Sequence, residues 1–153
     1  MKLTEQSVEL VEQESYDLNG IFKIIERAAR TCYASEPSSK TPEEFVNTLT
    51  KSGHLTPLEF GTVYLKYNIF DNPLDLANVL WFQNNKYSIV EHSEDNIVYY
   101  VTTNYRVLIE RGISINNYTF VEPDWQYHKK RLSFEIVTSI GISRELNRYR
   151  THN

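Results

Sequence analysis

Hydrophobic residues recur every three or four positions in the stretch that follows Asp17. The positions concerned are Ile21, Ile24, Ile25, Ala28 and Cys32. This spacing places them on one face of a helix and predicts an amphipathic helix of about four turns. Because Cys32 continues the hydrophobic face and no histidine lies near it in the sequence, we expect a buried structural thiol and not a reactive nucleophile.

A second helix is predicted from the residues that follow the serine-rich break around Pro37. Thr41, Pro42 and Glu44 supply an N-cap hydroxyl, a proline in the first turn and a glutamate at the third helical position. Together these residues are typical of a helix N-terminus. We expect the helix to stop at Gly53, since glycine readily adopts the left-handed conformation of a helix C-terminus.

Hydrophobic and polar residues then alternate over residues 62–69, which predicts a strand with one buried face. Weaker patterns predict strands at 8–11 and 132–137, helices at 74–82 and 105–111, a hairpin from 89–90 and 97–101, and a final helix from Ser143. These elements favour an α+β fold in which N-terminal helices pack on a mostly antiparallel sheet. The 153 residues, of which 41% are hydrophobic, suit a single domain over 1–153.

The composition limits the cellular location and the kinds of site that we expect for this protein. No apolar run in the sequence reaches the length of a signal peptide or the roughly 20 residues of a membrane span. The single cysteine excludes an internal disulfide, and the four histidines show no metal-ligand spacing. We therefore expect a soluble cytoplasmic protein that has no membrane partner and no metal site.

The net charge of −4 conceals a basic C-terminal segment. Residues 126–153 hold six basic and two acidic side chains, so this segment carries +4 and the rest of the chain −8. A basic cluster on an acidic chain favours a local anion site over a nucleic-acid-binding face. Arg144 and Arg148 lie four residues apart, and together with Arg150 they suit phosphate recognition. A solvated helix face explains the charge pattern equally well.

Two other stretches combine polar side chains in a way that suits ligand binding. Residues 53–59 bring His54, Thr56 and Glu59 into one short connection that a proline stiffens. On the pattern alone, a helix-to-strand connector with satisfied polar groups is the more common explanation. Residues 27–33 place two arginines and two alanines at the end of the first helix, where they suit close helix packing and contact with acidic neighbours.

Taken in order, these stretches resemble the motifs of the flavin-dependent thymidylate synthases. That family carries an R-A-A-R-type helix end, then H-x-T-P-[FL]-E-H, then R-H-R-x-x-S-x-N-E-x-S-x-R-Y. The corresponding stretches here are RAARTCY at 27–33, GHLTPLEF at 53–60 and SRELNRYRTHN at 143–153. The resemblance covers residues 21–69 and 131–153, and it leaves residues 70–130 as a family-variable insertion without an assigned function.

The resemblance implies an enzyme that methylates dUMP to dTMP with methylenetetrahydrofolate, FAD and NADPH and that assembles as a homotetramer. Such an enzyme works through its flavin, without a cysteine nucleophile, so no catalytic side chain is assigned. The positions at which the resemblance implies FAD contacts are His54, Thr56, Glu59, Arg148, Tyr149 and Arg150. The positions at which it implies dUMP contacts are Glu145, Leu146, Asn147 and Arg148.

The chain departs from the family motifs at three positions. Phe60 stands in place of the second histidine of the middle motif, Tyr149 replaces the central histidine of R-H-R, and Asn153 replaces the following serine. Only the first half of the third motif is present, so we expect this chain to be a fragment of a longer enzyme. The alternatives are an inactive truncated relative that serves as an oligomeric or flavin-binding module and, with least support, a nucleic-acid-binding protein.

Overall fold

The computed structural model describes residues 5–33 and 39–143 of the chain. These residues fall into two compact units: a ribbon unit of residues 5–12 and 131–143, and a core unit formed by the described part of residues 13–130. Helices and antiparallel strands make up the structure, which confirms the predicted α+β class. The single domain expected from the length of the chain stays a prediction.

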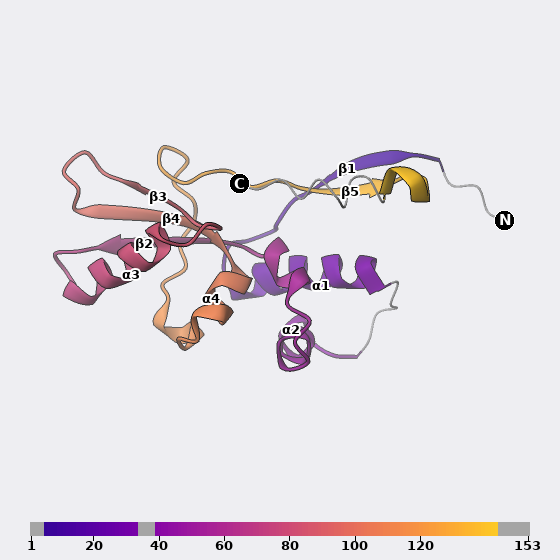
Figure 1. Cartoon of the computed structure of the whole chain (residues 1–153), viewed down its shortest axis with the longest axis horizontal. Helices are drawn as coiled ribbons and strands as arrows, with labels where there is room; N and C mark the ends of the chain where they lie inside the picture. Colours follow the sequence, from indigo (N-terminus) through magenta and orange to yellow (C-terminus); the bar gives the residue numbers. More distant parts are fainter. Residues whose placement is uncertain (1–4, 34–38, 144–153) are drawn as a thin grey trace. The chain divides into compact units, whose positions relative to one another are not determined.

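The ribbon unit is built on a two-stranded antiparallel pairing (Figure 1). In it, β1 (Ser7–Val11) pairs with β5 (Ser133–Val137). Both strands were predicted from their alternating patterns, whereas their pairing joins the two ends of the chain and has no local signal. Residues 140–143 are helical, with Ser143 N–H donating to the carbonyl of Ser139 at 2.9 Å. This helical segment thus begins three residues before the predicted start.

The sheet of the core unit has three antiparallel strands in the order β2-β4-β3 (Figure 1). They are β2 (Thr62–Asn68), β4 (Val98–Asn104) and β3 (Ile89–His92). The predicted hairpin is confirmed as the β3–β4 pair. Because β4 lies between the other two strands, residues 70–130 supply the centre of the sheet and belong to the same core as the rest of this unit.

The helices lie close to the predicted positions. They are α1 (Leu18–Tyr33), α2 (Pro42–Lys51), α3 (Pro73–Gln83) and α4 (Tyr105–Arg111), with short 3-10 helices η1 (Thr56–Phe60) and η2 (Ile115–Asn117). α1 packs against α2 and η1, whereas α3 packs against all three strands of the sheet. Within the described ranges, no helix combines the length and the apolar character needed to cross a membrane.

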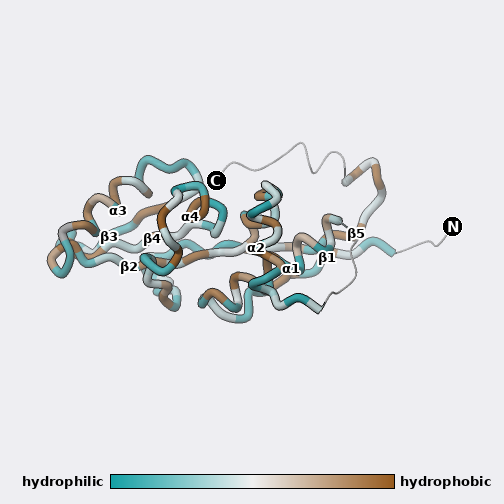
Figure 2. Tube along the Cα trace, turned by 90° about the horizontal axis from the view of Figure 1, so that it is seen from below, coloured by the Kyte–Doolittle hydropathy of each residue, from teal (hydrophilic) through white to brown (hydrophobic). Residues whose placement is uncertain are grey.

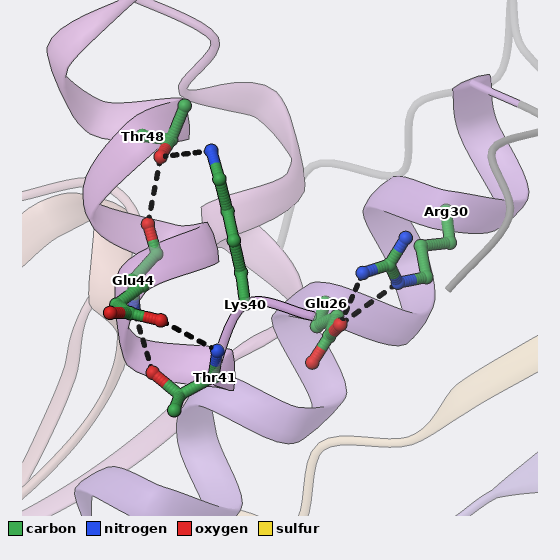
Figure 3. A network of polar contacts seen from close by, with 6 residues as sticks. All are labelled: Glu26, Arg30, Lys40, Thr41, Glu44 and Thr48. Atoms are coloured by element: carbon green, nitrogen blue, oxygen red, sulfur yellow. Dashed lines mark hydrogen bonds and ion pairs between the residues drawn. The ribbon is translucent and has the colours of Figure 1, made fainter. Parts of the chain in front are cut away.

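The N-terminus of α2 shows why local sequence predicts this helix well. Thr41 Oγ1 accepts a hydrogen bond from Glu44 N–H at 3.2 Å, and Thr41 N–H donates to Glu44 Oε2 at 2.9 Å (Figure 3). Lys40 Nζ adds a 3.2 Å bond to Thr48 Oγ1. This capping box satisfies two backbone groups that a helix start leaves unpaired. Just beyond the other end of α2, Gly53 has a φ of 75°, which is the left-handed conformation that glycine often adopts where a helix ends.

The hydrophobic core of the core unit joins α1 to the sheet. Figure 2 shows hydrophobic and polar positions interspersed along α1. The hydrophobic residues of this helix from Ile21 to Ala29 are mostly buried. At Gly61, just before β2, an added Cβ would lie 2.7 Å from Ile25 Cδ1 and 2.9 Å from Ile21 Cγ2, so the missing side chain permits close approach of α1. Other fully buried members include Val46, Leu58, Val79, Phe82, Val101 and Leu108.

The prediction that β2 buries only one face is wrong. Tyr64 and Leu65 are neighbours and therefore point to opposite faces, yet they are 1% and 0% exposed. The Tyr64 face is covered by aromatic rings from a distant segment: Trp125 at 5.7 Å and His128 at 5.0 Å between ring centroids. The aromatic ring of Tyr64 packs in the core, but its hydroxyl makes tyrosine count as polar in the sequence pattern. The alternation of hydrophobic and polar residues therefore predicted, wrongly, that this face of β2 is exposed.

Candidate functional site

The connector between α2 and β2 presents polar side chains from a rigid base. Pro57 and Leu58 are buried, while His54 and Thr56 are exposed. The short 3-10 helix η1 holds this stretch, with Leu58 N–H donating to the carbonyl of Leu55 at 3.1 Å. Since the apolar residues anchor the connector, its polar groups keep a defined position at the surface, as a binding loop requires.

The end of α1 meets this connector through Tyr33 and His54. The Tyr33 hydroxyl and His54 Nδ1 are 3.0 Å apart, and the two rings lie 5.6 Å apart between centroids. Tyr33 is the last residue of the RAARTCY stretch, and His54 is the second residue of GHLTPLEF. The structure therefore brings together two of the three motifs that sequence analysis selected. Both side chains are exposed, so they remain accessible to a ligand.

Glu59, at the other end of the connector, is bound by an arginine that the sequence analysis missed. Arg106 Nη1 donates to Glu59 Oε1 at 2.7 Å, and Arg106 Nε donates to Glu110 Oε1 at 2.7 Å. Hydrogen bonds to Glu110 and Glu59 raise the pKa of the Arg106 guanidinium above its usual value. The i,i+4 spacing of Arg106 and Glu110 is visible in the sequence, but the contact with Glu59 spans 47 residues and is not.

Arg106→Gln is expected to lower the free energy of unfolding by about 1 kcal/mol, because the half-buried Glu59 and the exposed Glu110 lose their shared partner. Urea denaturation followed by circular dichroism measures the change. Lys23→Gln is the matched control: its ion pair with Glu14 is more exposed, so it should change the free energy of unfolding less than Arg106→Gln does. Equal losses in both variants would show that Arg106 does not hold the connector.

Arg30 in the first motif has a structural role. Its Nη2 and Nε donate to Glu26 Oε1 at 2.6 and 2.9 Å, one turn earlier on α1 (Figure 3). The guanidinium carbon also lies 4.6 Å from the centroid of the Phe45 ring on α2. This cation–π contact ties α1 to α2. Arg30 therefore helps to place the helix whose end carries Tyr33.

The expectation of a buried structural thiol at Cys32 is wrong, because Cys32 is exposed. α1 turns its hydrophobic face inward as far as Ala29, which is fully buried. In the last turn of the helix, Thr31, Cys32 and Tyr33 are all exposed. The predicted helix is thus correct, but its buried positions end at Ala29, about one turn before the hydrophobic spacing ends at Cys32.

Apart from Ser143, the third motif lies outside the described residues. This applies to the arginine cluster Arg144, Arg148 and Arg150 and to the predicted positions Glu145, Leu146, Asn147 and Tyr149. Of the predicted FAD-contacting residues, the structure therefore places His54, Thr56 and Glu59 on one connector. Across residues 5–33 and 39–143, no group of three or more His, Cys, Asp or Glu side chains is arranged to hold a metal ion.

Comparison of the chain with protein-family models, with curated proteins and with solved structures found no match.

Proposed function

We propose that this chain belongs to the flavin-dependent thymidylate synthases and takes part in the reductive methylation of dUMP in the cytoplasm. In this proposal the connector residues His54, Thr56 and Glu59 contact FAD. The arginines at 148 and 150, with Tyr149, contact FAD and phosphate groups, and residues 145–148 face dUMP. NADPH and methylenetetrahydrofolate are the co-substrates, and the active assembly is a homotetramer.

The observation that supports the proposal is the 3.0 Å contact between Tyr33 and His54. Two motifs that lie 20 residues apart in the resemblance meet at one exposed surface, as residues of a common site must. The connector fits a flavin in its chemistry: His54 and Thr56 are exposed hydrogen-bonding groups, and the buried Pro57 and Leu58 keep them in place. A hydroxyl and an imidazole suit the polar edge of an isoalloxazine or the ribityl and phosphate groups attached to it.

The roles of the protein residues follow from what the flavin itself provides. When bound, FAD supplies the hydride chemistry of the reaction. The chain contributes binding and orientation, because guanidinium groups recognise phosphates and stabilise their charge. Glu59 is already paired with Arg106, so within this proposal it orients a neighbouring group through hydrogen bonds and does not act as a free base.

An FAD titration of the purified chain, with and without dUMP, tests the proposal. Saturable quenching of flavin fluorescence, with tighter binding when dUMP is present, is the expected result. His54→Ala should weaken FAD binding about tenfold by removing one hydrogen-bonding partner, whereas His92→Ala, which removes another exposed histidine, should leave it unchanged. FAD binding without methylation of dUMP would support the inactive flavin-binding alternative, and absence of saturable binding would contradict both.

A further inference from the structure

The helix α3 is hydrophobic on its outer side as well as on the side that packs in the core. Val79 and Phe82 belong to the core and are 1% and 0% exposed. Leu76 and Leu80 lie one turn apart on the outer side, with Ala77 beside them, and the two leucines are 43% and 50% exposed. A helix that is hydrophobic on all sides is normally buried on all sides, so this outer side lacks a cover within the described residues.

Large hydrophobic side chains are also exposed at the N-terminal end of α3. Phe70, in the turn before the helix, is 74% exposed, and Leu74, in its first turn, is 72% exposed. Their backbone is held in place, because Phe70 N–H donates to Asn68 Oδ1 and Leu74 N–H donates to Asn72 Oδ1, both at 3.1 Å. Exposed groups of large hydrophobic residues mark interaction surfaces. We call this set the α3 face: Phe70, Leu74, Leu76, Ala77 and Leu80.

Opposite charges lie at the two ends of the α3 face. Asp71 precedes the helix and Lys86 follows it, and both side chains are exposed. Asp71 Oδ2 accepts a hydrogen bond from Asn68 Nδ2 at 2.7 Å, which keeps the carboxylate at the N-terminal end. Lys86 Nζ lies 4.8 Å from the ring centroid of Tyr87, and among the described residues no carboxylate is within ion-pair distance of it.

We propose that the α3 face binds the same face of a second copy of this chain, with the two α3 helices antiparallel. A two-fold axis at the middle of the helix brings each Asp71 to the partner's Lys86. The same axis places Leu80 on the partner's Ala77, whose small side chain lets the helices approach closely. Antiparallel helices also align their dipoles favourably. The α3 face thus supplies both the hydrophobic surface and the opposite charges that complement it.

Analytical ultracentrifugation of the purified chain, without FAD, tests this interface. We expect the mean mass to rise with concentration from 18.0 kDa towards twice that value, with a dissociation constant in the micromolar range, as suits a small interface. Leu80→Arg should raise the dissociation constant by more than about tenfold, because it buries an unpaired charge at the centre of the interface. Val8→Arg is the matched control: Val8 is 66% exposed on the ribbon unit, and the same change there should leave association unaltered.

Charge reversal tests the antiparallel orientation separately. Asp71→Lys and Lys86→Asp should each weaken association about tenfold, because each change replaces attraction by repulsion at both symmetry-related ends of the interface. The double variant restores opposite charges and should associate nearly as tightly as the unmodified chain. Circular dichroism checks that Asp71→Lys, which loses the hydrogen bond from Asn68, stays folded.

Three results would overturn the proposed interface. They are a mass of one chain at every concentration, association that Val8→Arg weakens but Leu80→Arg does not, and a double charge variant that associates more weakly than either single variant. Because FAD is absent from these measurements, their outcome is independent of the proposed flavin site. That proposal requires a homotetramer but identifies no interface.

Discussion

Gly20→Ala is expected to lower the free energy of unfolding by about 3 kcal/mol, although helix propensity alone favours alanine by about 1 kcal/mol. Gly20 lies in the first turn of α1, where an added Cβ would stand 2.1 Å from the backbone oxygen of Ser15. Ser15 cannot yield easily: Gln13 Nε2 donates to this oxygen at 3.0 Å, and Ser15 Oγ donates to Asp17 Oδ1 at 2.7 Å.

The same substitution also weakens the start of the helix. Gly20 N–H donates to Asp17 Oδ1 at 2.8 Å, and this bond is the main reason why the pKa of Asp17 lies below its usual value. Displacing Gly20 lengthens the bond and leaves the first turn without its cap. Urea denaturation measures the loss, with Asn19→Ala as the control, because Asn19 is the exposed neighbour in the same turn. A stability of Gly20→Ala equal to or above that of the unmodified chain would contradict the proposed close contact.

The elements that sequence predicts well are those specified by neighbouring residues. The capping box of Thr41 and Glu44 involves residues three apart, and Gly112 ends α4 with a φ of 73°, as its residue type suggests. The hairpin of β3 and β4 likewise closes over a short turn, in which Asn96 adopts a φ of 58°. Local hydrogen bonding and backbone conformation decide each of these features.

Features that depend on distant parts of the chain were not predictable from the pattern. The pairing of β1 with β5 joins the two ends of the chain, and the second buried face of β2 depends on rings near residue 125. Exposure of Cys32 depends on where the core ends and not on helical spacing. In each case the property is set by tertiary packing, which overrides local preference.

The candidate site likewise combines features that neighbouring residues determine with features that depend on distant parts of the chain. The residue types of the polar connector singled it out in the sequence, and His54 and Thr56 are exposed on it in the structure. It did not reveal that Tyr33 would contact His54 or that Arg106 would bind Glu59, because these contacts cross 21 and 47 residues.

His128 is the buried histidine of the core unit and links the 124–128 turn to β2. It is 3% exposed, its Nδ1 accepts a hydrogen bond from Asp124 N–H at 2.9 Å, and its Nε2 lies 3.1 Å from the carbonyl oxygen of Leu65. Because a carbonyl only accepts, Nε2 must carry the proton and the ring must be neutral. A proton on Nδ1 would remove the acceptor for the Asp124 N–H and bring two N–H groups into repulsive contact.

The environment of His128 therefore disfavours the charged ring. Burial lowers the pKa of His128 below its ordinary value of 6.5, and the positive charge of Lys66 acts in the same direction. The hydrogen bond to Leu65 and the negative charge of Asp124 oppose the shift without cancelling it. The rings of Tyr64 and Tyr100 also pack against the imidazole, with centroids 5.0 and 5.3 Å from its own. The folded protein thus binds this proton less readily than the unfolded chain does.

His128 is expected to make the protein less stable as the pH falls below about 6.5. Its pKa is lowered on folding, so its contribution is fully present above 6.5 and is lost as the pH falls through the folded-state value. His128→Ala should remove this pH dependence and lower the free energy of unfolding at pH 7.5 by about 3 kcal/mol, because it leaves a cavity and two buried groups unpaired. His92→Gln, at an exposed position, should retain the full dependence. Urea denaturation between pH 5 and 7.5 distinguishes the two variants, and an unchanged slope in His128→Ala would assign the acid sensitivity to other groups.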